Sequence, residues 1–225
     1  KRIPVIAGSG ANSTSEAIHL TQRSKELGAD ACLLVTPYYN KPTQNGLFAH
    51  YKKIADEVSI PQILYNVPGR TSVDMLPDTV ERLSVHPNII GIKEASGNLE
   101  RSKELLDKCS ENLSVFTGDD KTSARDILMG FKGNISVTAN IVPFEMHNMC
   151  KLASIGKTVE AEKINAKIDT LHDNLFIESN PIPVKWALCK MGLINEGIRL
   201  PLTWMDKKYE SKLEKSLINA GVKLK

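Results

Sequence analysis

The sequence has 225 residues, of which 41% are hydrophobic and 24% are charged, which is an average composition for a globular protein. Its 29 basic and 26 acidic residues give a net charge of +3 and are interleaved along the chain, so nucleic-acid binding has little support. The four cysteines lie far apart and form no C-x-x-C pair, which argues against a zinc site and against a disulfide framework.

Six short apolar runs, rich in β-branched residues, recur before the chain becomes helical, and each is typical of a buried strand. They are residues 3–7, 31–36, 62–67, 89–93, 113–117 and 134–138. Segments with helical spacing lie between the runs, for example residues 15–27, 47–58 and 76–83. This alternation predicts an α/β protein with a parallel sheet.

The strand starts lie roughly 20 to 30 residues apart, which suits right-handed βα units. A dinucleotide-binding fold is disfavoured, because Ser13 stands where the fingerprint that Gly8-Ser9-Gly10 opens requires a third glycine. A closed parallel barrel needs eight strands, so two β/α units are unaccounted for. We expect residues 1–155 to form a partial barrel and residues 156–225 to form helices that complete and extend it.

Lys93 closes the run 89–93 and is the first candidate for chemistry, because barrel active sites lie at the C-terminal ends of the strands. Burial lowers the pKa of a lysine, and a neutral amine can attack a ketone to form an iminium. On pattern alone two structural roles stay open: Lys93 reaches solvent, or it pairs with Glu94. Lys185 is a rival, but its place in the first turn of a helix explains it more simply.

Tyr65 ends the preceding run, where a phenol can relay protons, although a buried tyrosine with a satisfied hydroxyl explains it equally. Arg70 follows the turn sequence Pro68-Gly69, which can aim a guanidinium at a carboxylate or leave it as an exposed loop arginine. The five histidines show no ligand spacing, so no metal is predicted. No apolar run reaches the length of a membrane span.

Three segments together resemble the 4-hydroxy-tetrahydrodipicolinate synthase family, also called dihydrodipicolinate synthase, within the N-acetylneuraminate lyase superfamily of class I aldolases. They are VTPYYNKP at 35–42, YNVPGRT at 65–71 and GIKEA at 91–95, and the likeness extends through the whole chain. The resemblance implies a lyase that condenses pyruvate with L-aspartate 4-semialdehyde through a lysine Schiff base, in the diaminopimelate route to lysine. It also implies that no metal or organic cofactor is needed, and that the enzyme is cytoplasmic.

By this resemblance Lys93 forms the pyruvate imine, Tyr65 and Tyr39 relay protons, and the Ile135 backbone lines the pyruvate pocket. Arg70 matches the arginine that binds the carboxylate of the semialdehyde. Tyr39 matches a tyrosine that reaches into the site of a neighbouring subunit, so the resemblance implies a homo-oligomer, a tetramer built as a dimer of dimers.

Asn12, Glu16 and Tyr38 match positions that bind L-lysine at a dimer interface in lysine-inhibited members of the family, which makes feedback inhibition a hypothesis. Ordinary structural roles explain the same residues, because Ser13-x-x-Glu16 reads as a capping box and Tyr38 can pack as an aromatic side chain.

Family members begin with two further β/α units that carry a Thr-Thr pair, and one of these threonines links the two tyrosines of the proton relay. We therefore expect a TIM (β/α)8 barrel with a C-terminal helical extension that lacks here its first two units. An N-terminal portion beyond this sequence is favoured over a truncated chain, because six strands alone leave two exposed edges.

Two other functions stay open. Another pyruvate-dependent aldolase, such as N-acetylneuraminate lyase, would share the lysine and the tyrosine and differ in carboxylate recognition, and Arg70 within VPGRT favours the synthase. A non-catalytic truncated homologue would keep the subunit interface without turnover.

Overall fold

The computed structural model describes residues 2–225. The chain divides into two compact units, and each is described by itself. The first comprises the residues up to Asp119 together with Met129–Gly133, and the second comprises Asp120–Leu128 and Asn134–Lys225.

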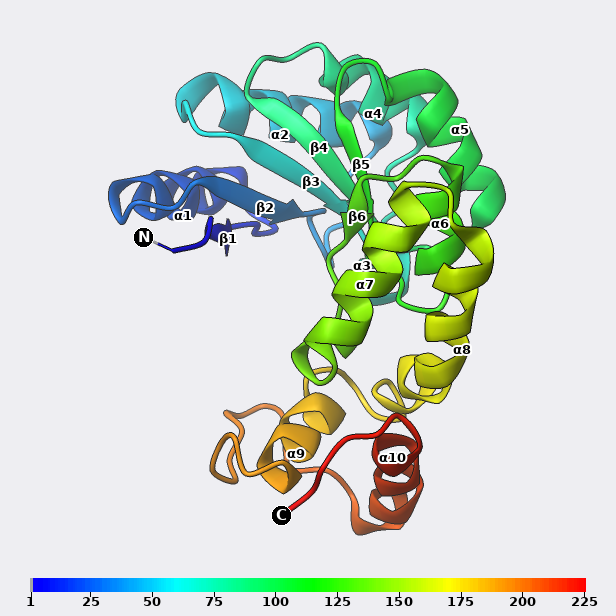
Figure 1. Cartoon of the computed structure of the whole chain (residues 1–225). Helices are drawn as coiled ribbons and strands as arrows, with labels where there is room; N and C mark the ends of the chain where they lie inside the picture. Colours follow the sequence, from blue (N-terminus) through cyan, green and yellow to red (C-terminus); the bar gives the residue numbers. More distant parts are fainter. Residues whose placement is uncertain (1) are drawn as a thin grey trace. The chain divides into compact units, whose positions relative to one another are not determined.

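A six-stranded sheet forms the centre of the first unit, with its strands in the order of the sequence (Figure 1). The strands are β1 (Ile6–Gly8), β2 (Ala31–Val35), β3 (Gln62–Asn66), β4 (Ile89–Glu94), β5 (Ser114–Thr117) and β6 (Gly133–Asn134). The first five pair in parallel, as successive βα crossovers require. The predicted α/β class with a parallel sheet is confirmed.

Four helices of the first unit follow one another against the sheet (Figure 1). They are α1 (Thr14–Glu26), α2 (Gln44–Glu57), α4 (Pro77–Ser84) and α5 (Leu99–Cys109). Each turns an apolar side inward, and Leu47, Ile54, Leu83 and Leu105 are fully buried. The helices predicted at 15–27, 47–58 and 76–83 are confirmed, with small shifts at their ends.

The second unit is mainly helical, as the sequence predicts beyond Pro143. Its longer helices are α7 (Pro143–Ser154), α8 (Thr158–Asn174), α9 (Ile182–Lys190) and α10 (Lys207–Asn219), preceded by most of α6 (Ser123–Met129) and by the 3-10 turn η1 (Thr138–Asn140). Met149, Leu171, Trp186 and Leu213 belong to one buried apolar cluster that these helices share. The unit therefore has a core of its own.

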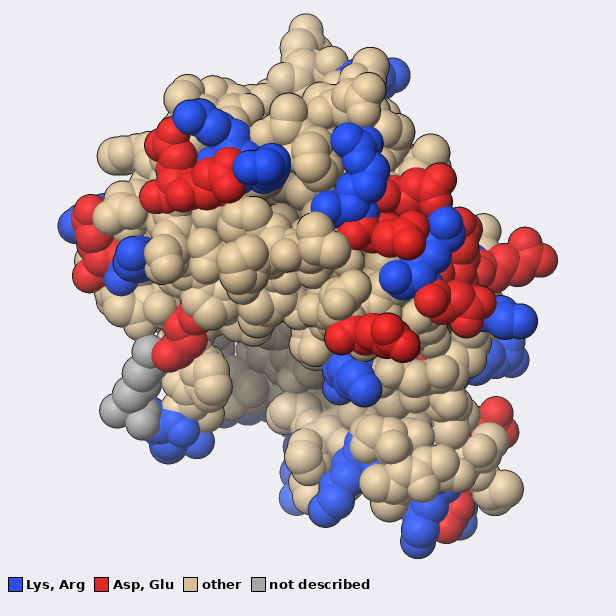
Figure 2. Space-filling view, turned by 90° about the horizontal axis from the view of Figure 1, so that it is seen from above, with Lys and Arg blue, Asp and Glu red and all other residues tan. Residues whose placement is uncertain are grey.

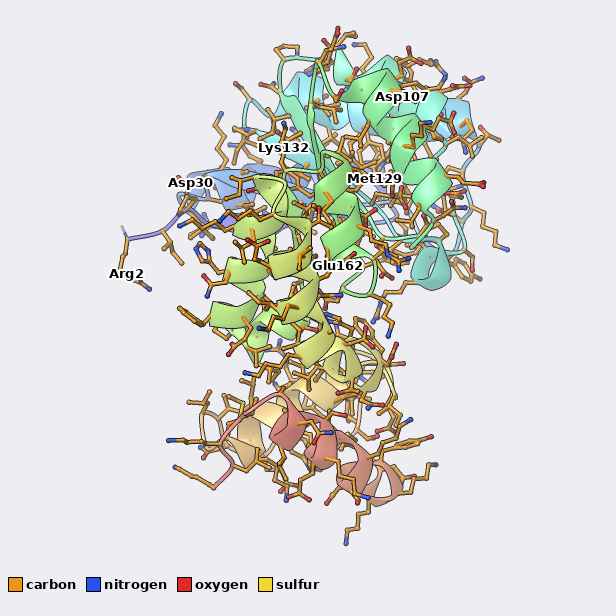
Figure 3. All side chains as sticks on the ribbon, turned by 45° about the vertical axis from the view of Figure 1, so that its right-hand side comes forward. Arg2, Asp30, Asp107, Met129, Lys132 and Glu162 are labelled. Carbon is orange, nitrogen blue, oxygen red and sulfur yellow. The ribbon has the colours of Figure 1, made fainter. Side chains whose placement is uncertain are left out.

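Two predicted strands have different bounds in the structure. The first run was expected at residues 3–7, but β1 begins at Ile6, since Pro4 lacks an amide donor and the Val5 amide donates to the Asp30 carboxylate at 2.7 Å (Figure 3). The sixth run was expected at 134–138, but β6 ends at Asn134. The amides of Val137 and Thr138 donate to the Asp120 carboxylate, at 3.0 and 2.9 Å, in place of a strand partner.

The predicted capping box at the start of α1 is wrong. Ser13 is the N-cap residue by its backbone, but its side chain makes no capping hydrogen bond and instead lies 3.0 Å from the Ser15 hydroxyl. Glu16 is exposed in the first turn, where its charge favours the positive end of the helix dipole. Its structural role is therefore weaker than the sequence suggested.

Basic and acidic side chains alternate over the face seen in Figure 2, as their interleaving in the sequence implies. Within residues 2–225, no helix is long and apolar enough to cross a membrane.

Candidate active site

Tyr65 and Lys93 lie next to each other on neighbouring parallel strands. The register pairs Tyr65 of β3 with Lys93 of β4, one residue before each strand ends. The Lys93 Nζ atom lies 4.2 Å from the centroid of the Tyr65 ring. Both side chains are half-buried, so the amine is close to the phenol ring and still open to a small molecule.

A bulge in β4 sets this pairing. Gln62 is opposite Ile89 whereas Ile63 is opposite Gly91, so Ile90 is an extra residue with no partner of its own on β3. Ile90 is 41% exposed, unlike the buried Ile89 and Gly91 on either side of it. The extra residue shifts every later pair of the two strands by one position, and this brings Lys93 opposite Tyr65.

Gly118, directly after β5, leaves the space that the Lys93 side chain occupies. A Cβ atom at Gly118 would lie 2.5 Å from Lys93 Cε and 2.8 Å from Ala95 Cβ, distances that real Cβ contacts do not show. The Gly118 amide also donates to the Glu94 carbonyl at 2.7 Å, which fixes the backbone close to the lysine. A side chain at position 118 therefore competes with Lys93 for the same volume.

Burial raises the pKa of the Tyr65 phenol, and the positive charge of Arg70 opposes that rise. Since an ordinary tyrosine already titrates near pH 10, the Tyr65 hydroxyl keeps its proton at neutral pH. It can therefore donate a proton or a hydrogen bond to a group beside Lys93.

Arg70 lies on a short helix that follows β3 directly. The sequence predicts a turn here, but Pro68 occupies a first-turn position of α3 (Pro68–Thr71), as its fixed φ allows. The hydroxyl of Thr71 anchors this helix by sharing its one proton between the Val67 carbonyl at 3.2 Å and the Val73 carbonyl at 3.0 Å. The Arg70 side chain is exposed, at the same end of the sheet as Tyr65 and Lys93.

A charged cluster lies behind Tyr65 and Lys93. Its members are the residues that follow them, Asn66 and Glu94, together with Asp74 and Arg101; we call it the outer-face cluster. Consecutive strand residues project to opposite faces, so this cluster and the Tyr65–Lys93 pair flank the same two strands. Glu94 is 2% exposed and accepts from Arg101 Nε at 2.9 Å, Asn66 Nδ2 at 3.1 Å and the Ser96 amide at 2.7 Å.

Tyr38 and Tyr39 follow β2 in a loop with an unusual backbone. Tyr39 adopts a left-handed φ of +75° and is 88% exposed, while Tyr38 is 42% exposed. A left-handed conformation is uncommon for a tyrosine and marks a backbone held in place by its surroundings. Asn40 supplies one such tie, because its side-chain amide donates to the Asn12 carbonyl at 2.8 Å.

The three residues of the predicted lysine-binding set lie in two segments of the first unit. Asn12 precedes α1 and Glu16 is in its first turn, whereas Tyr38 is in the loop after β2. The Asn40–Asn12 hydrogen bond joins these segments. Glu16 and Tyr38 are both exposed, and Asn12 is half-buried.

Ile135 belongs to the second unit, in the segment between β6 and η1. The buried carboxylate of Asp120 orders this segment by accepting from Asn134 Nδ2 at 2.8 Å and from the amides of Val137 and Thr138. The Thr138 hydroxyl also lies 2.9 Å from His172 Nδ1, and burial lowers the pKa of this histidine. The neutral ring can thus share a hydrogen bond with the threonine without burying a charge.

The model of the dihydrodipicolinate synthetase family matches residues 1–220. The chain belongs to the dihydrodipicolinate synthetase family. It is 61% identical to the 4-hydroxy-tetrahydrodipicolinate synthase of Stutzerimonas stutzeri over 98% of this chain and 76% of that protein. The predicted function, a class I lyase of the dihydrodipicolinate synthase type, is confirmed at the level of the family.

Solved structures of the family agree with the fold. The chloride-inhibited dihydrodipicolinate synthase of Acinetobacter baumannii, complexed with pyruvate, is 56% identical with a TM-score of 0.98, over 99% of this chain and 77% of that chain. The enzyme of Cyanidioschyzon merolae, with lysine bound, is 38% identical with a TM-score of 0.93, over 98% of this chain and 75% of that chain. This chain thus spans about three quarters of the length of these relatives.

Lys93 and Tyr65 were predicted at the ends of neighbouring strands, and the structure pairs them there. The contact of Gly118 with Lys93 and the hydrogen bonds of Asn66 and Arg101 were not predicted, since each involves a partner distant in the sequence. Glu94 was considered as a partner of Lys93, whereas its carboxylate bonds to Arg101 and Asn66 on the other face of the sheet. No cluster of three or more candidate metal ligands is present within residues 2–225.

The overlap between Gly118 and Lys93 can be measured as an interaction energy. We expect Gly118→Ala to lower the free energy of unfolding by about 2 kcal/mol, as overpacking of a filled site does. In a Lys93→Ala background the same change should cost about 1 kcal/mol less, because the lysine side chain is gone while Ala95 remains. Urea denaturation of the four variants gives the comparison.

Gly69→Ala is the matched control, because a Cβ at Gly69 would meet nothing within 4 Å. An equal loss from Gly118→Ala in both backgrounds would show that the glycine does not make room for the lysine.

Proposed function

We propose that this chain condenses pyruvate with L-aspartate 4-semialdehyde to 4-hydroxy-tetrahydrodipicolinate, with Lys93 as the residue that forms the imine. The observation that carries the proposal is the Lys93 amine beside the Tyr65 ring at the carboxyl ends of two parallel strands. Membership of the family supports it, as does the pyruvate complex of the relative from Acinetobacter baumannii.

The reaction begins when the neutral Lys93 amine attacks the ketone carbon of pyruvate and the adduct loses water. The resulting iminium withdraws electrons, so the pyruvate methyl group loses a proton and becomes a nucleophilic enamine carbon. This carbon adds to the aldehyde of the second substrate, whose oxygen takes up a proton. The amino group of the second substrate then displaces Lys93 and closes the ring, so that one water is released overall.

Tyr65 is the proposed proton donor and acceptor for these steps. Its hydroxyl keeps its proton at neutral pH, because burial raises the pKa of the phenol, and it can therefore protonate the oxygen that leaves as water. The charge of Arg70 lowers the cost of a transient phenolate. The two residues thus cooperate, while the exposed guanidinium of Arg70 binds the carboxylate of the semialdehyde. The Ile135 backbone is proposed to line the pyruvate pocket.

We further propose that Tyr39 acts in the active site of a second copy of the chain, within a dimer of dimers. Its 88% exposure and its left-handed backbone favour a side chain that is presented outward by a constrained loop. The relay of each site would then include the Tyr39 hydroxyl of its neighbour.

The six strands are proposed to belong to an eight-stranded (β/α)8 barrel. Parallel pairing in sequence order supports a further strand at the β1 edge, as do the exposed apolar side chains of Ile6 in β1 and of Val5 just before it, 48% and 49% exposed. A crystal structure of a longer form in which β1 pairs with no strand besides β2 would contradict this. The domain boundary between residues 155 and 156 and the cytoplasmic location stay predictions.

Reductive trapping tests the chemistry. We expect pyruvate with cyanoborohydride to modify one lysine, located at Lys93 by peptide mapping, and Lys93→Ala to remove the adduct. Lys185→Ala is the matched control and should leave labelling unchanged. Labelling of Lys185 in place of Lys93, or no labelling at all, rejects the proposal and favours a non-catalytic role.

Arg70→Gln separates the binding of the two substrates, because pyruvate labelling and turnover of the semialdehyde are measured on the same variant. It should leave pyruvate labelling within about twofold and lower kcat/KM for the semialdehyde by about 100-fold, since a charge-assisted bidentate pair contributes roughly 3 kcal/mol. Cleavage of N-acetylneuraminate by a chain that labels with pyruvate but does not use the semialdehyde would point to the sister lyase.

Mixed oligomers test Tyr39. Tyr39→Phe and Lys93→Ala should each be inactive alone. Refolding equal amounts together should restore about a quarter of the normal rate for dimers, because about half of the dimers are mixed and each mixed dimer has one site with both residues. Two inactive parents that give an inactive mixture would place Tyr39 in its own subunit's site or outside the relay.

Regulation by L-lysine is proposed through Asn12, Glu16 and Tyr38, and the lysine-bound relative from Cyanidioschyzon merolae supports it. Millimolar L-lysine should lower the initial rate, and Glu16→Gln should weaken the inhibition by removing a carboxylate from the ligand's amino group. His19→Gln, exposed on the same helix, is the control. Unchanged initial rates at millimolar lysine would reject the regulatory role.

A further inference from the structure

We propose that Arg101, acting through Glu94 and Asn66, is a positioning residue that holds Lys93 and Tyr65 at their working distance. The inference rests on the proposed function, because it concerns the residues that would form the imine. It adds to that function a set of side chains that never touch the substrate and yet set the geometry of the two that do.

The outer-face cluster begins one residue after each reactive side chain. Tyr65 is followed by Asn66 and Lys93 by Glu94, and the register pairs Asn66 with Glu94 just as it pairs Tyr65 with Lys93. The Asn66 amide nitrogen donates to Glu94 Oε2 at 3.1 Å, which is a side-chain link across the two strands in addition to the backbone ladder. The peptide units that carry the reactive side chains are therefore tied together from behind.

Asn66 also fixes the segment that follows α3. Its amide nitrogen donates to Asp74 Oδ1 at 2.9 Å, and its amide oxygen accepts from the Met75 amide at 3.0 Å. Both side-chain atoms of this fully buried asparagine are thus bonded to fixed partners. A rotation of Asn66 would break several hydrogen bonds together, so the end of β3 has one preferred conformation.

Arg101 closes the cluster from α5. Its Nε donates to Glu94 at 2.9 Å, one terminal nitrogen donates to Asp74 at 3.1 Å, and the other donates to the Met75 carbonyl. Only 11% of the Arg101 side chain and 2% of the Glu94 side chain is exposed. The planar guanidinium reaches three acceptors from three directions, which a lysine ammonium on a flexible stem does not reproduce.

The positive charge of Arg101 compensates the buried carboxylate of Glu94. Glu94 is a buried carboxylate next in sequence to the reactive lysine, and removal of Arg101 leaves its charge without a cationic partner. The resulting shift of Glu94 disturbs the end of β4, where the Glu94 carbonyl accepts from the Gly118 amide at 2.7 Å. Gly118 lies directly beside the Lys93 side chain. A shift of the Gly118 backbone therefore displaces Lys93.

The test compares Arg101→Gln with Lys108→Gln, which removes a positive charge from the same helix where it is more exposed and pairs with Asp78 and Glu81. The measurement is the time course of Lys93 labelling by pyruvate and cyanoborohydride at several pyruvate concentrations. Circular dichroism gives the folded fraction of each variant. The rate of labelling reports on position, whereas its final extent reports on how much protein is folded.

We expect Arg101→Gln to lower the maximal labelling rate of the folded protein about tenfold or more, because a misplacement of the order of 1 Å has effects of this size or larger. The half-saturating pyruvate concentration should stay within about twofold, and Arg101→Lys should restore part of the rate. Lys108→Gln should label like the unaltered chain. Where Arg101→Gln does not fold, Glu94→Gln carries the same test, since it keeps the shape and weakens the pair.

Two results would overturn the inference, and they are distinguishable. A normal labelling rate with a lower final extent in both cluster variants shows that the cluster serves stability alone. Failure of the unaltered chain to label at all rejects the proposed function, and with it the role assigned to Arg101.

Discussion

The extra residue in β4 is the constraint on which the rest of the site depends. In a continuous parallel ladder, Ile63 would face Ile90 and Tyr65 would face Ile92, so Lys93 would project away from the tyrosine. Because the side-chain period of a strand is two, a slip of one residue exchanges the two faces of everything that follows. One bulge therefore decides that an amine and a phenol share a face.

The same two strands separate two electrostatic environments. On one face a lysine and a tyrosine lie half-buried, and Arg70 adds a positive charge that acts on the phenol. On the other face Arg101 pairs with the carboxylates of Glu94 and Asp74. The buried Glu94 carboxylate, next in sequence to Lys93, therefore bonds to Arg101 and Asn66 on the face opposite the amine.

Local pattern predicted the parts of this fold in which local and tertiary preferences agree. The runs that became β2 to β5 are apolar because most of their side chains are buried, and the helices between them bury one apolar side. Pattern failed where a distant side chain competes for backbone amides: Asp30 takes the amide of Val5, and Asp120 takes those of Val137 and Thr138. Lys93 could be predicted as a lysine in a largely buried strand, and its side chain is half-buried. The close contact with Gly118 and the pairing of Arg101 with Glu94 depend on residues that no short motif brings together.

The Lys93 side chain requires a residue without a Cβ atom at position 118, although that residue has no reactive group. A designer who moved the lysine–tyrosine pair to another parallel sheet would copy two side chains and a bulge, and would still fail if the following strand ended in any residue with a Cβ. The arrangement that would have to be copied thus spans β3, β4 and β5 and includes a glycine directly after β5. The missing Cβ atom at Gly118, directly after β5, is therefore as specific a requirement of this site as the amine on β4.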